Sequence, residues 1–93
     1  MTVEGSLAGR IALVTGASRG LGFEIARRMA EQGARVWLNG RGASAVEAAA
    51  ERIGPNARAL PFDIGDDQAS AAAFARLAED GLDILVNNVG QRD

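Results

Sequence analysis

Three glycines follow a short apolar run, and their spacing is suited to binding phosphate. Residues 15–22 read TGASRGLG. Gly16 lets the chain turn sharply without a Cβ clash. Gly20 lets the main chain approach a pyrophosphate closely, and Gly22 lets a following helix pack tightly on a sheet. The N–H groups and the positive dipole end at the start of that helix would then face the anion. We therefore expect a phosphate-binding turn; the alternative is that these are ordinary turn glycines of some other α/β protein.

The elements on either side of this turn differ in periodicity. Residues 10–15 form an apolar run whose length and β-branched content predict a strand buried on both faces. From Leu21 onward the apolar residues Leu21, Ile25 and Met29 recur every fourth position, which predicts an amphipathic helix. Gly33 is placed to end this helix in the left-handed conformation. The glycine turn thus lies between a strand and a helix, as a phosphate-binding turn requires.

The same alternation continues along the chain. Further strands are expected over residues 34–39, 57–62 and 83–87. Ser44 and Glu47 have the spacing of a capping box for a helix that ends at Gly54 and Pro55. Asp66 or Asp67 caps a third helix, which Gly81 would close. Strands that alternate with helices pair in parallel through right-handed crossovers. The pattern βαβαβαβ predicts an α/β fold, the N-terminal portion of a Rossmann-type doubly wound parallel sheet, and residues 1–93 are expected to form one such half-domain.

Three motifs in order resemble those of the short-chain dehydrogenase/reductase family. The glycine turn matches TGxxxGxG; Asp63 stands where the family has an Asp that meets the adenine ring; and residues 87–90, NNVG, stand where it has NNAG. Val89 replaces the usual Ala. The resemblance covers nearly the whole chain and implies an oxidoreductase that transfers hydride between a nicotinamide and a carbonyl or alcohol substrate. It implies these cofactor-binding residues: Gly16, Ser18, Arg19, Gly20, Leu21, Gly22, Arg41, Asp63, Ile64, Asn87, Val89 and Gly90.

Each motif also has a plainer interpretation that is independent of a cofactor. Asn87 and Asn88 are residue types that bond their own backbone in turns. Asp63 could simply flank a helix. Arg19 and Arg41 could be solvated loop cations.

The residues after the second strand favour NADP over NAD. Domains that bind NAD place an acidic residue there, where it accepts from the ribose 2′-OH. In this sequence that position is Gly40, and Arg41 follows it. A carboxylate would repel a 2′-phosphate, whereas Gly leaves room and Arg can bind it. Arg19, within the glycine turn, is a second cation on the same side, and charge-assisted hydrogen bonds of this kind contribute roughly 1.5–3 kcal/mol each. We therefore expect NADP(H) as the cofactor.

Two residue types that the family uses for catalysis, Tyr and Lys, do not occur in this sequence. The resemblance implies a Tyr as general acid or base, a Lys beside it, a Ser and an Asn, all at positions beyond Asp93. All ten basic side chains are Arg, and Tyr, His and Cys are absent. We therefore assign no catalytic residue and no metal ligand here, and expect the chain alone to be inactive. Two alternatives remain: a non-catalytic NADP-binding sensor or structural module, and a remnant that aggregates or pairs through its exposed strands.

Composition limits the partners of the protein. The net charge is −2, and no basic run suggests a nucleic-acid or membrane surface. The longest apolar runs are too short to cross a bilayer, and the first residues do not have the pattern of a signal peptide. We expect a cytoplasmic protein with a small-molecule substrate and, since family members associate through segments further along the chain, a homo-oligomer.

Overall fold

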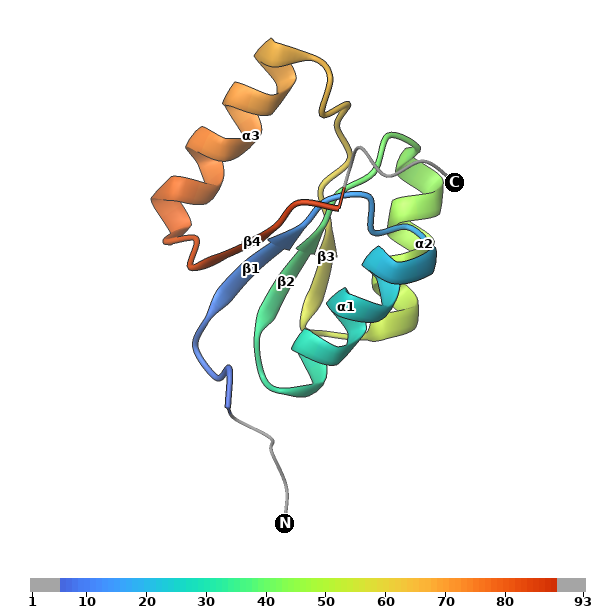
Figure 1. The fold of residues 1–93 in the computed structure, drawn as a ribbon, viewed down its shortest axis with the longest axis vertical. Helices are drawn as coiled ribbons and strands as arrows, with labels where there is room; N and C mark the ends of the chain where they lie inside the picture. Colours follow the sequence, from blue (N-terminus) through green and yellow to red (C-terminus); the bar gives the residue numbers. More distant parts are fainter. Residues whose placement is uncertain (1–5, 89–93) are drawn as a thin grey trace.

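The computed structural model describes residues 6–88, which form a four-stranded parallel sheet with helices on both faces (Figure 1). Strands and helices alternate along the whole described chain, as the sequence predicts. The elements in order are β1 (Ile11–Val14), α1 (Gly20–Glu31), β2 (Arg35–Leu38), α2 (Ala43–Ile53), β3 (Ala57–Ala59), α3 (Asp67–Asp80) and β4 (Ile84–Val86).

The order of the strands creates a switch point beside β1. In the sheet the order is β3-β2-β1-β4, and every neighbouring pair is parallel. The chain therefore moves outward from β1 to β3 and then crosses back to β4 on the other side of β1. Ligands of such sheets bind outside the carboxyl ends of the strands at this reversal. The expected Rossmann-type fold is confirmed, and the reversal lies between β1 and β4, so this rule points to a site beyond the carboxyl ends of these two strands.

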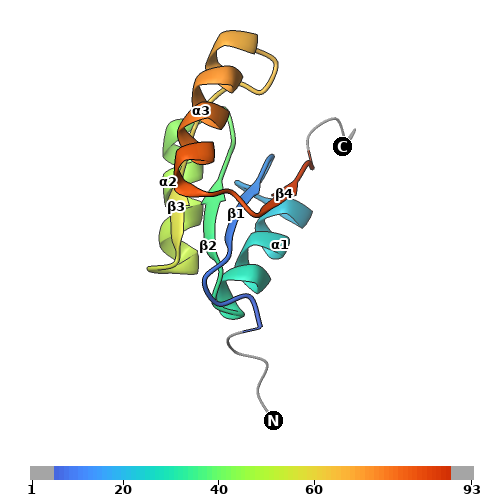
Figure 2. The ribbon, with the colours of Figure 1, turned by 90° about the vertical axis from the view of Figure 1, so that its left-hand side faces the viewer.

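One face of the sheet carries most of the core. Helices α1 and α2 pack against it, while α3 lies on the opposite side of β1 and β2 from α1 (Figure 2). Burial of the strand residues follows from helices covering both faces. The buried cluster on the α1–α2 side is made of Val14, Ala17, Phe23, Ala26, Ala30, Ala34, Val36, Leu38, Val46, Ala49, Ala50 and Ala57. Small side chains dominate it, so the helix axes can lie close to the sheet.

The buried face of α1 differs from the predicted stripe. The buried residues of this helix are Gly22, Phe23, Ala26 and Ala30, whereas Leu21 is 66% exposed. Ile25 and Met29 pack only at the margin of the core. The prediction followed the larger apolar side chains, but the helix turns its small residues toward the sheet because these allow the closest approach.

Helix α2 corrects a second expectation. It begins at Ala43 with Gly42 as its N-cap, and no side chain caps it, so the predicted capping box of Ser44 and Glu47 does not form. Ser44 lies inside the first turn, too late to accept from the first N–H groups. The predicted end at Gly54 is confirmed, and Val46 and Ala50 face the core as expected.

Helix α3 begins and ends where the sequence predicts. The Asp66 side chain accepts from the N–H groups of Gln68 and Ala69, and Gly81 closes the helix with a φ of 86°. Strand β3 is shorter than predicted and ends at Ala59. The N–H groups of Leu60 and Phe62 still donate to the carbonyl oxygens of Leu38 and Gly40, so main-chain bonds to the β2 side continue past Pro61. No helix within residues 6–88 is long and apolar enough to span a membrane.

Candidate cofactor site

The glycine turn joins β1 to α1 in a form that requires glycine. Gly16 and Gly20 have φ values of 59° and 64°, in the left-handed region that side chains disfavour. A Cβ on Gly22 would lie 2.2 Å from the carbonyl oxygen of Gly16 and 2.8 Å from Nδ2 of Asn88. A Cβ on Gly20, by contrast, would meet nothing within 4 Å. The turn is therefore packed tightly on its inner side and open on its outer side, as a main-chain cradle for an anion should be.

Two helices start at this edge of the sheet without a side chain that caps them. The N-caps of α1 and α2 are Arg19 and Gly42, and neither makes a side-chain cap hydrogen bond. The first N–H groups of a helix have no acceptor inside the helix. In α3 the Asp66 carboxylate fills that role. The starts of α1 and α2 thus keep main-chain donors that can serve an anionic ligand.

A polar network connects the glycine turn to the end of β4. The Asn88 side chain donates to the carbonyl oxygen of Gly16 at 3.2 Å, and its main-chain N–H donates to the Thr15 hydroxyl at 2.8 Å. That hydroxyl also lies 3.1 Å from Oδ1 of Asn87. Asn87 is thereby placed beside the turn. The predicted residues Val89 and Gly90 lie outside the described residues.

A hollow of about 390 Å³ opens beside the turn, at the carboxyl ends of β1, β2 and β3. Five predicted cofactor residues line it: Gly16, Ser18, Arg41, Asp63 and Ile64. They come from three separate loops, so the fold brings together residues up to 49 positions apart in the sequence, from 16 to 65. An adenosine half of a dinucleotide fits the position of this hollow, next to an open glycine turn.

Other predicted residues lie near this hollow but do not line it. Arg19, Gly20 and Leu21 belong to the start of α1, and the Leu21 side chain is largely exposed. Gly20 and Leu21 offer main-chain groups rather than side chains to the site. Asp63 is exposed, and its Oδ1 accepts from the N–H of Gly65 at 2.9 Å. That carboxylate therefore also shapes its own loop.

Asn39 is a site residue that the sequence reasoning missed. Its side chain is buried, with 1% exposure, and it lines the hollow. Nδ2 donates to the carbonyl oxygens of Phe62 at 2.9 Å and Leu60 at 3.3 Å. Asn39 therefore ties the end of β2 to the loop that carries Asp63. The signal in the sequence was a single amide residue directly after an apolar strand, in a position where a further apolar residue would be ordinary.

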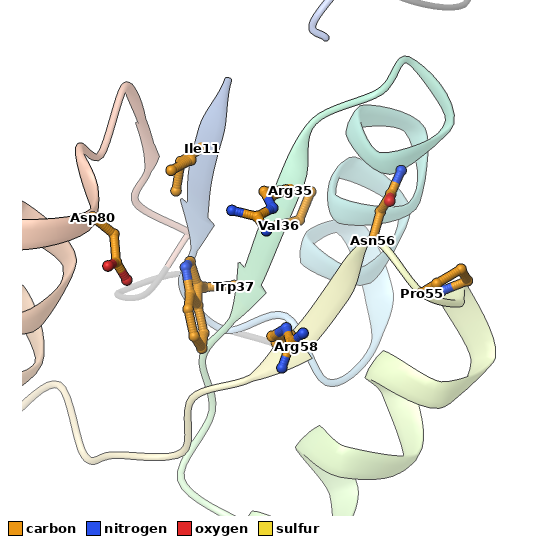
Figure 3. A pocket seen from close by; sticks show the side chains of 8 residues that line it. All are labelled: Ile11, Arg35, Val36, Trp37, Pro55, Asn56, Arg58 and Asp80. Atoms are coloured by element: carbon orange, nitrogen blue, oxygen red, sulfur yellow. The ribbon is translucent and has the colours of Figure 1, made fainter. Parts of the chain in front are cut away.

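A second hollow, of about 410 Å³, lies at the opposite end of the strands (Figure 3). Trp37, Arg35 and Arg58 line it together with Asp80 of α3. Ile11 and Arg35 are the first residues of their strands, so this hollow is at the amino-terminal end of the sheet. Ligands of open α/β sheets bind at the carboxyl ends. The hollow with Arg41 and Asp63, not this one, is therefore the candidate cofactor site.

Within residues 6–88, no group of His, Cys, Asp and Glu side chains could hold a metal ion.

Comparison with known proteins shows the family of the chain. A sequence profile of the family described as short chain dehydrogenase matches residues 10–93. The chain belongs to this family. It is 43% identical over 90 residues to gluconate 5-dehydrogenase of Gluconobacter oxydans, covering 91% of this chain and 35% of that protein. It is 44% identical to a "Probable NADP-dependent dehydrogenase" of Dichelobacter nodosus, covering 86% of this chain and 77% of that protein.

Solved structures of this family share the fold. A structure described as "Pseudomonas aeruginosa RhlG/NADP active-site complex" is 44% identical, with a TM-score of 0.84, over 98% of this chain and 38% of that one. A protein described as a short chain dehydrogenase/reductase family protein is 46% identical with a TM-score of 0.85, over 91% of this chain and 35% of that one. The chain thus spans about a third of the length of most of these family members.

Proposed function

We propose that this protein is an NADP(H)-dependent oxidoreductase of the short-chain dehydrogenase family, and that residues 1–93 are its cofactor-binding part. The observation that carries the proposal is the position of Arg41. It lines the hollow beside the open glycine turn, and the residue before it has no side chain. When bound, NADPH supplies a hydride for a carbonyl carbon, or NADP⁺ accepts one from an alcohol carbon.

The residues of the chain divide the binding of the cofactor between them. The main-chain donors at the start of α1, with Gly16 and Gly20, face the pyrophosphate. Asp63 and Ile64 lie on the adenine side. Arg41 binds the 2′-phosphate, and Arg19 is a second cation for the same group. The nicotinamide-ribose side of the cofactor is bound by Asn87, Val89 and Gly90. Relatives whose names contain NADP, and the solved complex with NADP, support this choice.

A segment outside residues 1–93 supplies the catalytic groups in this proposal. The sequence has no Tyr, His or Cys, and its ten basic residues are all Arg. The Tyr and Lys that the family uses for proton transfer would therefore come from elsewhere in the polypeptide or from a partner. Residues 1–93 alone are proposed to bind cofactor without turnover.

The names of the relatives indicate a general class of substrate. Their names describe dehydrogenases of gluconate, serine and neomenthol, and reductases of 3-oxoacyl-[acyl-carrier-protein]. All are alcohol or carbonyl compounds, so we propose a carbonyl or alcohol substrate. We also propose a homo-oligomeric, cytoplasmic protein with no nucleic-acid or membrane partner.

The decisive experiment measures NADPH and NADH binding by calorimetry in the complete polypeptide, followed by oxidation of NADPH with a panel of ketones and aldehydes. NADPH should bind at least tenfold more tightly than NADH, and at least one carbonyl should be reduced. Equal binding of both cofactors would refute the NADP assignment. Tight NADPH binding without turnover on any carbonyl would instead favour the non-catalytic sensor or structural module, which the missing catalytic residue types make the second candidate.

A further inference from the structure

Gly40 lines the candidate cofactor site, although its backbone does not require glycine. The described glycines with positive φ are Gly9, Gly16, Gly20, Gly33, Gly54 and Gly81. Gly40 is not among them, so its backbone conformation is one that residues with side chains adopt. A side chain at residue 40 is therefore excluded by a contact and not by the backbone conformation.

That contact comes from Val46 on α2. A Cβ built on Gly40 would lie 2.7 Å from Cγ2 of Val46, which is closer than real carbon atoms approach. The next nearest atoms are Cβ and Oγ of Ser18, both at 3.7 Å, an ordinary van der Waals distance. A single methyl group therefore excludes a side chain at residue 40.

Val46 has little freedom to move that methyl group away. Its side chain is 0% exposed and belongs to the buried cluster between the sheet, α1 and α2. A β-branched residue in a helix has one strongly preferred χ1 rotamer. The Val46 N–H also donates to the carbonyl oxygen of Gly42 at 3.0 Å, which fixes it on the turn of α2 that follows Arg41.

We propose that Val46 is a positioning residue for cofactor choice. By keeping residue 40 without a side chain, it keeps a carboxylate out of the ribose side of the site and leaves the space beside Arg41 to a 2′-phosphate. An acidic residue at this position is what selects NAD in dinucleotide-binding domains. This inference rests on the proposed NADP function and adds to it a buried residue, not proposed to contact the cofactor, that restricts which side chain residue 40 can carry.

A set of variants in the complete polypeptide tests the effect on the cofactor. Calorimetry with NADPH and with NADH compares the wild type, Gly40→Asp, Val46→Ala and Gly40→Asp/Val46→Ala. Val46→Ala should keep the NADPH preference. Gly40→Asp should lose NADPH binding tenfold or more without gaining NADH, because its carboxylate is misplaced by the clash. The double variant should bind NADH at least tenfold more tightly than Gly40→Asp does. If Gly40→Asp alone binds NADH as tightly as the double variant, the inference is wrong.

Thermal unfolding tests the contact separately from any cofactor. Gly40→Ala adds only the Cβ, so it should lower the melting temperature by several degrees with Val46 present and have little effect in the Val46→Ala background. Val36→Ala, a second buried valine of the same cluster, is the matched control and should leave the cost of Gly40→Ala unchanged. An equal cost in all backgrounds would overturn the inference. A wild type without NADPH preference, but with this coupling intact, would overturn the proposed function and leave the steric exclusion at residue 40 standing.

Discussion

The side-chain nitrogen of Asn39 lies 2.9 Å from the carbonyl oxygen of Phe62 and donates a hydrogen bond to it. This bond joins the last residue before Gly40 to the loop that carries Asp63. Both segments line the candidate cofactor site. The shape of the site therefore depends on one buried amide that makes no predicted contact with the cofactor.

Replacing this amide should affect both stability and binding. Asn39→Ala removes two hydrogen bonds from a buried position and leaves two carbonyl oxygens without that donor. We therefore expect the free energy of unfolding to fall by about 1–3 kcal/mol. NADPH affinity should fall as well, because the wall that carries Asp63 is released. Denaturant unfolding and calorimetry measure the two effects. Asn56→Ala is the matched control, since Asn56 also donates to a main-chain oxygen, that of Ala30, away from the site. Unchanged affinity in Asn39→Ala would contradict this role.

Arg41 should discriminate between the two cofactors. Arg41→Gln removes a cation but keeps a polar side chain, and the loss of a charge-assisted hydrogen bond should weaken NADPH binding roughly ten- to a hundredfold. NADH binding should change little. Arg28→Gln, which alters an exposed arginine of α1, is the control and should leave both affinities unchanged. An equal loss of NADPH and NADH affinity in Arg41→Gln would show that Arg41 does not act on the 2′-phosphate.

Gly22 should tolerate no side chain. In Gly22→Ala the new Cβ would lie 2.2 Å from the carbonyl oxygen of Gly16, so helix α1 must move away from the turn. We expect a loss of about 1–3 kcal/mol or more in unfolding free energy, measured by chemical denaturation. At Gly42 the nearest atom to an added Cβ is Cβ of Ala45 at 3.9 Å. Gly42→Ala should therefore cost only about 1 kcal/mol or less, as expected for a helix N-cap. Similar costs for both variants would refute the close approach at Gly22.

The type and order of the elements could be predicted from the sequence, because apolar runs and four-residue periodicity are local signals. The ends of the elements were less predictable. Strand β3 ends at Ala59, before the predicted Phe62, and α2 begins before Ser44 can cap it. Leu21 shows a different limit: its size suggested burial, but the small side chains of Gly22 and Ala26 decide which face of α1 approaches the sheet.

The candidate site was predicted where a motif marks it and missed where only packing does. The glycine turn, Arg41 and Asp63 stand in recognisable positions relative to the predicted strands. The role of Asn39 depends on where the main chain of residues 60–62 passes, and the effect of Val46 on Gly40 depends on a 2.7 Å distance between a loop and a helix. Neither relationship has a local signal, because both are created by the tertiary fold.

Strand β4 should make a polypeptide of residues 1–93 associate in solution. It is the last strand of the sheet among the described residues, so its outer edge has unpaired main-chain groups that another strand can bond. Leu85, on this strand, is 50% exposed. Leu85→Lys places a charge on the edge and should shift the polypeptide toward monomer in sedimentation velocity. Leu21→Lys, which changes a leucine on α1 that is 66% exposed, is the control and should not. A wild-type segment that stays monomeric and melts cooperatively at low concentration would mean that β4 needs no further strand beside it.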